Sequence, residues 1–468
     1  MTLPQIDKDS AEPIRRQIYT QMKDQIFSGQ LCSGEALPST RQLAEELSVS
    51  RSTVVEAYDM LLAEGFLESR QGAQTVVADG LVMERPARQN AGETKRGSPR
   101  ITADFSTGRP DLELFSHAQW VKLLSASATS LPAKQYGYTG PEGFLPLRQE
   151  IAAWLMRSRG LISDAEDIFI TAGATQALRI LCDMLCAGGG RVMLEDPCHK
   201  GLYDTLRMTD CEIIPVSADD HGLQTDRLSD QAKADMIYVT PSHQFPLGGI
   251  LPAARRAALI RYARAHDSYI VEDDYDSEFR YVGAPIAPLY SMDSQRVIYV
   301  GTFSKTIFPA LRIGFVILPK NLQSRWRDIR THHDVQNPPF EQAALAEFMR
   351  SRKLDRHIRS MRRVYATRRQ TLMQSLDQHF GTEWAPCGDA AGLHVTIRFC
   401  GIRFDEAMMA RCTEAGVKVV PLETHCIEKG RHEDALVLGF GHLKEEQIEQ
   451  GVRQLADVLH HEDGIAIN

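Results

Sequence analysis

The sequence predicts a multidomain protein in which an all-α N-terminal module precedes a larger α/β unit with a mainly parallel sheet. Its 468 residues exceed what one ordinary hydrophobic core holds. Residues 10–79 show helical apolar spacing, and residues 80–102 form a polar stretch that reads as a flexible, basic linker. Over residues 103–460, short apolar runs alternate with helical segments, which is the pattern of an α/β layer.

Composition narrows the class of protein. A content of 43% hydrophobic and 24% charged residues is that of a globular chain, which excludes a mainly disordered or fibrous protein. No apolar run reaches the roughly 18 residues of a membrane span, and the N-terminus has no signal-peptide pattern, so we expect a cytoplasmic protein without membrane contact. The nine cysteines lack zinc-site spacing, so we expect no metal site.

The first module divides into three predicted helices and a hairpin. Apolar residues four apart predict an amphipathic helix over 13–28. Ser39 to Gln42 fits a capping box that begins a second helix ending near Leu47. Ser50 can cap a third helix that runs to about Glu64, where Gly65 stops it. Two short helices joined by a tight turn predict a helix-turn-helix, with residues 66–77 as a two-stranded wing.

In a helix-turn-helix, the start of the second helix of the motif faces base edges in the major groove of double-stranded DNA. The residues in that position are Arg51, Ser52 and Thr53, while Arg41 can reach phosphate or base and Arg70 lies in the wing. Residues 1–79 hold 7 Lys and Arg against 12 Asp and Glu, so DNA contact must come from a few local cations and helix N-termini. The alternative is a helical protein-interaction module with solvated arginines.

The α/β unit carries a set of polar residues at the ends of predicted strands. Gly301 to Lys305 follow one apolar run, and Asp273 and Tyr275 end another. Pyridoxal 5′-phosphate requires a lysine for a Schiff base, a carboxylate against its ring nitrogen, a hydroxyl partner and a phosphate cradle. Each feature alone is commonly structural, but together they predict a site for this cofactor, and the residues that supply it are Lys305, Asp273, Tyr275, Thr302, Ser304, Arg312, Ala174 and Thr175.

Both parts resemble known families. The segments PSTRQLA and VSRSTVVEAYDMLLAEG resemble the GntR-type winged helix, although the wing reads Gln-Gly-Ala-Gln-Thr where the family has a Gly-Ser-Gly-Thr-like turn. The segments TAGATQAL, TPSHQFPLGG, EDDYDSEFRY and GTFSKTIFPALRIGF resemble fold-type I aminotransferases. Together they resemble the MocR/GabR-type regulators, which implies a large subdomain over about 130–335 and a small one over about 336–460.

The resemblance implies roles for individual residues. Lys305 would form the Schiff base (aldimine), Asp273 would face the ring nitrogen and Tyr275 the ring hydroxyl. His243 and Gln244 would lie in the loop that borders the ring. The resemblance also implies a head-to-tail homodimer with composite sites, in which a tyrosine reaches the phosphate of the partner subunit. The phosphate ligands would be Arg312, Thr302, Ala174, Thr175 and, from the partner, Tyr138, with Tyr136 as the alternative.

Two positions depart from the family. Where a tyrosine usually stacks on the ring, this chain has Cys198-His199, so His199 is the expected stacking group, with Tyr203 as the fallback and a satisfied loop histidine as the structural alternative. The arginine that grips a substrate carboxylate is replaced by Val437 in the segment Leu-Val-Leu-Gly-Phe. This loss argues against ordinary transamination.

These features lead to one expected function and two alternatives. The first is a DNA-binding transcription regulator that senses a small amine or amino-acid-like metabolite through Lys305 and does not turn it over. The second is an active aminotransferase with an attached DNA-binding module. The third is a regulator whose effector is pyridoxal phosphate itself.

Overall fold

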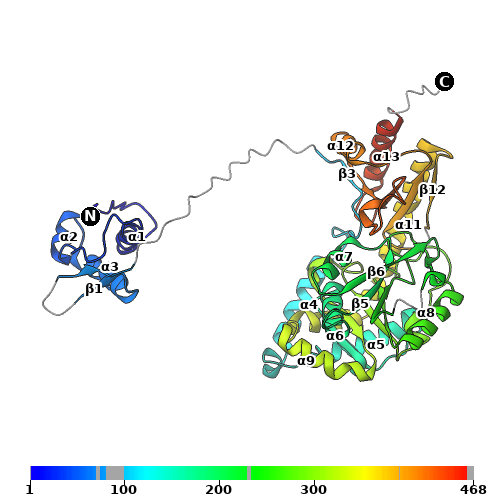
Figure 1. The fold of residues 1–468 in the computed structure, drawn as a ribbon, viewed down its shortest axis with the longest axis horizontal. Coiled ribbons are helices and arrows are strands. Elements are labelled where there is room, and N and C mark those ends of the chain that lie inside the picture. Colours follow the sequence, from blue (N-terminus) through cyan, green and yellow to red (C-terminus); the bar gives the residue numbers. More distant parts are fainter. Residues whose placement is uncertain (1, 70–73, 81–99, 229–232, 389–390, 461–468) are drawn as a thin grey trace. The chain divides into compact units, whose positions relative to one another are not determined.

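The computed structural model describes residues 2–69, 74–80, 100–228, 233–388 and 391–460. The chain divides into two compact units, residues 1–97 and 98–468, each of which is described by itself (Figure 1). Most of the linker predicted at 80–102, and Arg70 of the predicted wing, lie outside the described residues. The linker boundaries therefore stay a prediction.

The first unit is a three-helix bundle with a small hairpin. Fully buried Ile18, Leu43, Val54 and Leu61 bring the three helices onto one core. The strands pair antiparallel, with Leu67 opposite Val77. Its elements are α1 Ile14–Phe27, α2 Thr40–Glu46, α3 Arg51–Ala63, β1 Leu67–Glu68 and β2 Val76–Val77.

Capping hydrogen bonds mark the starts of α2 and α3 at the residues that the sequence predicts. The Ser39 hydroxyl accepts from the Gln42 N–H and the Ser50 hydroxyl from the Thr53 N–H, each at 3.2 Å. Gly65, with φ of 75°, ends α3 in the left-handed conformation that glycine adopts at little cost. The Gln42 amide, however, donates to Glu46 at 3.2 Å, so the reciprocal half of the predicted capping box is not formed between these described residues.

The second unit is built on an eight-stranded sheet of order β4-β11-β10-β9-β8-β5-β6-β7. The central pairs from β10 to β6 are parallel, whereas β11 and β7 run antiparallel to their neighbours. The strands are β4 Ile168–Thr171, β5 Arg191–Asp196, β6 Glu212–Asp219, β7 Gly222–Leu223, β8 Met236–Val239, β9 Tyr269–Asp274, β10 Val297–Thr302 and β11 Gly314–Ile317.

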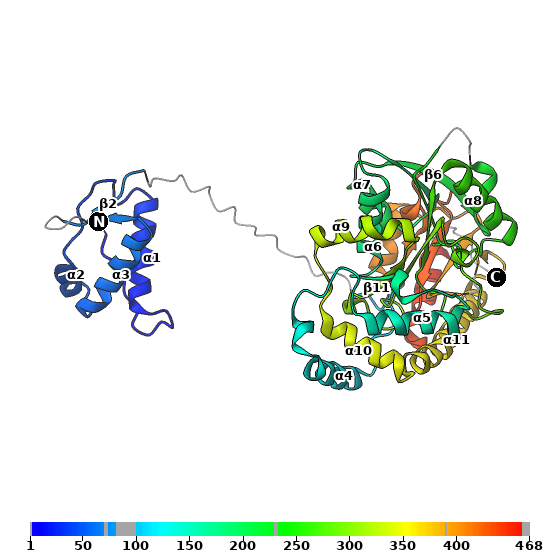
Figure 2. The same cartoon turned by 90° about the horizontal axis from the view of Figure 1, so that it is seen from below.

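Both faces of this sheet are covered by helices. Successive side chains of a strand point to opposite faces. Ile270 and Val297 accordingly pack with α5 (Leu145–Arg159) and α8 (Ala253–His266) in one core. Val271 and Ile298 pack with α6 (Ala174–Leu185) and α9 (Gln323–His333) in another. In Figure 2, α5 and α10 (Pro339–Arg350) lie on one side of β11, and α6 and α9 lie on the other. Burial on both faces explains why these strands are continuous apolar runs.

A smaller layer follows, joined to the large sheet by the long helix α11. Its sheet has the order β12-β13-β16-β15, and a separate pair joins β3 to β14. Its strands are β12 Trp384–Pro386, β13 His394–Phe399, β15 Val420–Pro421 and β16 Ala435–Gly439, with β3 Ala103–Asp104 and β14 Val417–Lys418 in the pair. None of the helices formed by the described residues has the length and apolar character needed to span a membrane.

The described residues of the second unit also form ten α-helices and several short 3-10 helices. The α-helices are α4 His117–Ser130, α5 Leu145–Arg159, α6 Ala174–Leu185, α7 Lys200–Arg207, α8 Ala253–His266, α9 Gln323–His333, α10 Pro339–Arg350, α11 Lys353–Phe380, α12 Glu406–Glu414 and α13 Glu445–His460.

A buried ion pair lies beneath the carboxyl edge of the sheet, and it gives a stability prediction. Arg159 and Asp274 have side chains 4% and 1% exposed. We expect Arg159→Met to destabilise the second unit by about 3–5 kcal/mol, because a buried carboxylate loses its counter-ion. Arg191→Met removes an exposed pair with Glu212 and should cost at most about 1 kcal/mol. Urea unfolding followed by near-UV circular dichroism measures both, and equal losses would contradict the prediction.

Candidate cofactor site

A cavity of about 440 Å³ opens at the carboxyl ends of β9 and β10. Parallel pairing sets Val300 opposite Asp273 and Gly301 opposite Asp274, so both strands end at the same edge. The cavity gathers predicted residues from four separate segments of the sequence. Those that line it are Ala174, Thr175, His199, Asp273, Tyr275, Thr302, Ser304, Lys305 and Arg312.

Lys305 projects into this cavity from the turn after β10. Its Nζ donates to the carbonyl oxygen of Gly108 at 2.6 Å. Gly108 has φ of 75°, a conformation that favours glycine, and a Cβ there would lie 2.8 Å from Nζ and displace the end of the lysine side chain. Burial lowers the pKa of Lys305, and the nearby Asp276 and Asp273 offset part of that effect. A lowered pKa favours the neutral amine, which is the nucleophilic form.

Asp273 is the group predicted to face a ring nitrogen. One carboxylate oxygen, Oδ2, accepts from the Tyr238 hydroxyl at 2.6 Å. The other, Oδ1, is buried and has no partner among the described residues. Burial raises the pKa of Asp273 to about 7. A protonated ring nitrogen placed against Oδ1 would satisfy this oxygen and lower the pKa again, so the residues present fit the pyridine ring.

The opposite end of the cavity has the donors that a phosphate needs. The Arg312 guanidinium donates to the carbonyl oxygen of Ala172 beside the start of α6. A Cβ at Gly173, where φ is 93°, would lie 3.0 Å from the same guanidinium. The Thr302 hydroxyl donates to Ser304 at 3.0 Å. A helix start, a guanidinium and hydroxyls are the groups that bind phosphate in proteins, so the residues present fit the phosphate of the expected cofactor.

His199 lies on the wall where the stacking group is expected. It caps α7, because its Nδ1 accepts from the Leu202 N–H at 3.3 Å. Its ring centroid is 5.2 Å from that of Phe245, and both residues line the cavity. The fallback Tyr203 is not among the described lining residues and packs instead under Arg207. Burial lowers the pKa of His199, which keeps its imidazole neutral.

Tyr275 is held by a buried histidine and aspartate. His243 Nδ1 lies 2.8 Å from Asp276 Oδ1 and 2.9 Å from the Tyr275 hydroxyl, and His243 and Asp276 are each 2% exposed. An N–H at Nδ1 donates to the carboxylate and can share that proton with the Tyr275 oxygen. The Tyr275 hydroxyl then keeps its own proton for an acceptor in the cavity.

The two tyrosines considered for the partner subunit differ in their surroundings. Tyr138 is 90% exposed, and its hydroxyl has no partner among the described residues. The Tyr136 hydroxyl donates to the carbonyl oxygen of Ala128 at 2.7 Å, and its ring packs on Phe340. The free hydroxyl of Tyr138 favours it over Tyr136 as the residue that reaches a second copy.

Val437 lies in β16 and is fully buried. Its neighbours Leu247, Leu422 and Ala218 form a small apolar cluster with it. The valine therefore belongs to an apolar wall, and it is not one of the described residues that line the cavity.

Several lining residues were missed by the sequence analysis. Tyr238 in β8 bonds to Asp273, Phe245 and His394 form part of the wall, and Gly108 accepts from Lys305. In the run MIYV, Tyr238 resembles an ordinary buried residue of a β-strand. The loop around Phe245 was expected to border the ring through His243 and Gln244, and Gly108 lies in the segment STGRP, which carries no reactive side chain pattern. His243 and Gln244 are buried and do not line the cavity within the part of the chain described.

In the first unit, two of the predicted DNA-contacting residues, Arg41 and Arg51, share one surface. Arg41 and Arg51 line the same shallow depression, and Arg51 and Ser52 are exposed at the start of α3. Arg41 is held only by an exposed pair with Glu45 at 3.3 Å among the described residues. The Ser52 and Thr53 hydroxyls bond to the capping Ser50, at 2.8 and 2.7 Å.

Comparison with known proteins agrees with this geometry. Residues 14–77 match the bacterial regulatory proteins of the gntR family, and residues 105–455 match aminotransferase class I and II. The chain is 32% identical to a probable rhizopine catabolism regulatory protein, MocR, of Rhizobium meliloti, over 96% of this chain and 94% of the relative. The chain belongs to the MocR-type transcription regulators of the GntR family.

Two further relatives bear on the cofactor of this MocR-type chain. The pyridoxine biosynthesis regulator PdxR of Corynebacterium glutamicum is 33% identical, over 95% of this chain and 96% of its own. The multiple substrate aminotransferase of Thermococcus profundus superposes with a TM-score of 0.72 at 26% identity, covering 78% of this chain and 93% of that one. The cofactor of this MocR-type domain is pyridoxal 5′-phosphate.

The contacts of Tyr275 give a spectroscopic prediction. We expect Tyr275→Phe to raise the pH midpoint of the visible absorbance of the bound cofactor by about one unit, because a hydrogen bond to its ring oxygen is lost. His243→Phe should move the midpoint in the same direction by less, since it leaves the tyrosine but frees its hydroxyl. Tyr203→Phe, outside the cavity, is the matched control. An unchanged midpoint in His243→Phe would show that the histidine does not orient the tyrosine.

Proposed function

We propose that this chain is a DNA-binding transcription regulator that senses a small amine or amino-acid-like metabolite through a Schiff base at Lys305. The observation that carries the proposal is the cavity itself, which joins a lysine of lowered pKa to a carboxylate oxygen that has no hydrogen-bond partner in the described part of the chain. Both lie in a chain whose other unit is a GntR-type DNA reader.

This chain's own residues would hold the cofactor at both ends. Arg312, Ser304 and the start of α6 would bind the phosphate, and Asp273 would keep the ring nitrogen protonated. When bound, the cofactor supplies an electrophilic carbon that captures amines. Tyr275, oriented by His243, would donate a hydrogen bond to the ring oxygen. These contacts fix the ring so that an incoming amine meets a single orientation.

The remaining wall supports an effector that this chain does not grip through a carboxylate. Lys305 and Arg312 are the only Lys or Arg residues among the described lining residues, and the cofactor occupies both. His199 and His394 are held neutral, and burial lowers the pKa of His394 to about 3. Val437, at the position where an arginine grip is expected, is apolar and is not among the described lining residues. Neutral side chains would therefore recognise the effector through hydrogen bonds, and no arginine would form a bidentate ion pair with a carboxylate of the effector.

Regulation would pass through a homodimer. The exposed Tyr138 supports a head-to-tail arrangement in which each subunit completes the partner's phosphate site. Effector binding would then bias the geometry in which two winged helices meet the operator. Residual aminotransferase turnover is the alternative for the same residues, and continuous formation of a keto product from an amino donor would establish it.

A second candidate effector is pyridoxal phosphate itself. It is favoured by the 33% identity to a regulator named for pyridoxine biosynthesis and by the valine where a carboxylate grip is expected. In that case, DNA affinity would depend on the cofactor alone and no amine would alter it.

Lys305→Ala tests the sensing site. We expect the variant to lose the visible absorbance of the lysine-bound cofactor while its far-UV circular dichroism stays unchanged, because the lysine is a ligand and not a core residue. Titration of the wild type with a panel of amines should shift the band for the effector and change DNA affinity at the same concentrations. Full absorbance in Lys305→Ala would refute the assignment of the lysine.

Arg51→Ala tests the DNA-reading surface. We expect it to weaken binding to the region upstream of the protein's own gene by about tenfold to a hundredfold, the range for one lost base contact. Arg16→Ala, an exposed arginine on α1, is the control and should bind as the wild type does. Gel retardation at fixed salt measures both. Equal binding by wild type and Arg51→Ala would remove the helix start from the interface.

A further inference from the structure

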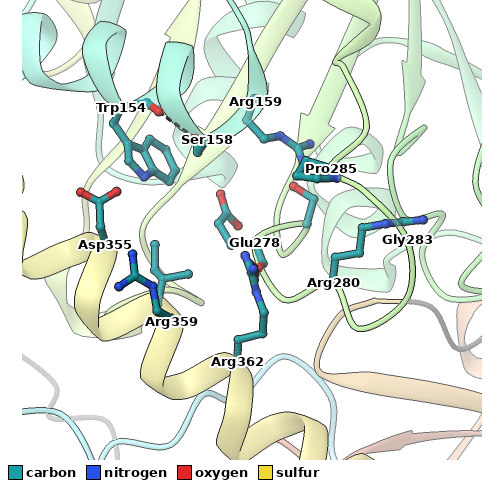
Figure 3. Close-up of a pocket in the computed structure, with 12 residues that line it drawn as sticks. Trp154, Ser158, Arg159, Glu278, Arg280, Gly283, Pro285, Asp355, Arg359 and Arg362 are labelled. Carbon is teal, nitrogen blue, oxygen red and sulfur yellow. Dashed lines mark hydrogen bonds between the residues drawn. The ribbon is translucent and has the colours of Figure 1, made fainter.

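A second cavity lies apart from the cofactor site and is used by none of the functions proposed above. It is about 210 Å³ in volume and shares no described lining residue with the cofactor cavity. Its walls are the last turns of α5, the loop over residues 277–285 and the first turns of α11 (Figure 3). Trp154 and Ile358 give it an apolar side, and the rest of the wall is polar.

Buried polar atoms without partners concentrate in this wall. Ser277 Oγ, Glu278 Oε2 and Arg159 Nε have no hydrogen bond among the described residues, and these residues are 7%, 9% and 7% exposed. Buried polar atoms in folded proteins nearly always have a partner. Among the described residues that line the cofactor cavity, only Asp273 has a buried polar atom without a partner. That atom is Oδ1, the oxygen assigned to the ring nitrogen of the cofactor. The same feature in the second cavity points to a second ligand.

The charge at this cavity is positive. Arg280, Arg359 and Arg362 line it, and none of them forms an ion pair among the described residues. Burial raises the pKa of Glu278 to about 8, so its carboxyl is largely uncharged at neutral pH. The lining carboxylate Asp355 is already paired outside the cavity with Arg352, at 2.9 Å.

We propose that this cavity binds a small oxyanion, a carboxylate or a phosphate, between the guanidinium groups of Arg280, Arg359 and Arg362. Guanidinium groups match planar or tetrahedral oxyanions through paired N–H donors. Figure 3 shows the side chain of Arg362 rising from α11 to Glu278, and that of Arg359 lying on the Asp355 side of the cavity. The Arg362 guanidinium also donates to the Glu278 carbonyl oxygen at 2.6 Å, which fixes it on the cavity wall. Ser277 adds a hydroxyl that makes no hydrogen bond to any described residue.

The test uses the full-length protein with its cofactor bound, so that the phosphate cradle at Arg312 is already filled. Calorimetric titration with inorganic phosphate, and separately with succinate, is compared with chloride at equal ionic strength. We expect saturable binding of at least one, and the responding probe identifies the oxyanion as phosphate or carboxylate. Arg359→Ala/Arg362→Ala should weaken that binding by about tenfold or more.

Arg356→Ala/Arg363→Ala is the matched control, because it removes two charges from the same helix without touching the cavity. It should change binding by less than about twofold if the site is specific. Arg362 also bonds to the loop at Glu278, so its loss can destabilise the protein. If Arg359→Ala/Arg362→Ala has a lower melting temperature than the wild type in chloride, the single variant Arg359→Ala is used for the test. Absence of binding by both probes would mean that the cavity holds only water, and equal weakening by the control would mean general surface attraction. Either result overturns the proposal.

Discussion

The parallel pairing of β9 with β10 is the constraint on which the cofactor site depends. Because the two strands run side by side in the same direction, Asp273 and the turn that bears Lys305 reach the same edge of the sheet. Beneath that edge, the carboxylate of Asp274 is held by Arg159 and by the Tyr299 hydroxyl at 2.6 Å. This buried network ties β9 to α5 and to β10, so the cavity above it has a rigid floor.

The cofactor cavity is built from groups whose charges are unbalanced without a ligand. Burial moves Asp273 and Lys305 toward their neutral forms, with the pKa of one raised and the other lowered. A protonated ring nitrogen would supply the counter-ion that Asp273 lacks. Because a ligand that binds the folded state stabilises it, occupancy of this site and stability of the second unit must be linked. A sensor needs such a link, whereas a purely structural core does not.

The sequence predicted most of the fold because its signals were local. Caps at Ser39 and Ser50 and apolar runs buried on both faces depend on neighbours in the chain, and the structure bears them out. The sequence did not reveal the residues whose role depends on contacts with distant parts of the chain. Tyr238 matters only because β8 lies beside β9, and Gly108 only because its loop folds back over Lys305. Neither relation leaves a periodic trace in the sequence.

The charge of the first unit bears on how regulation could work. With 7 Lys and Arg against 12 Asp and Glu over residues 1–79, one reader has few cations to set against DNA phosphates. Affinity that rests on few phosphate contacts is modest, and joining two such readers raises it through effective concentration. In the proposed homodimer, that gain exists only while both readers fit their half-sites together. A small change in subunit geometry would therefore alter DNA binding greatly, although neither reader changes its own contacts.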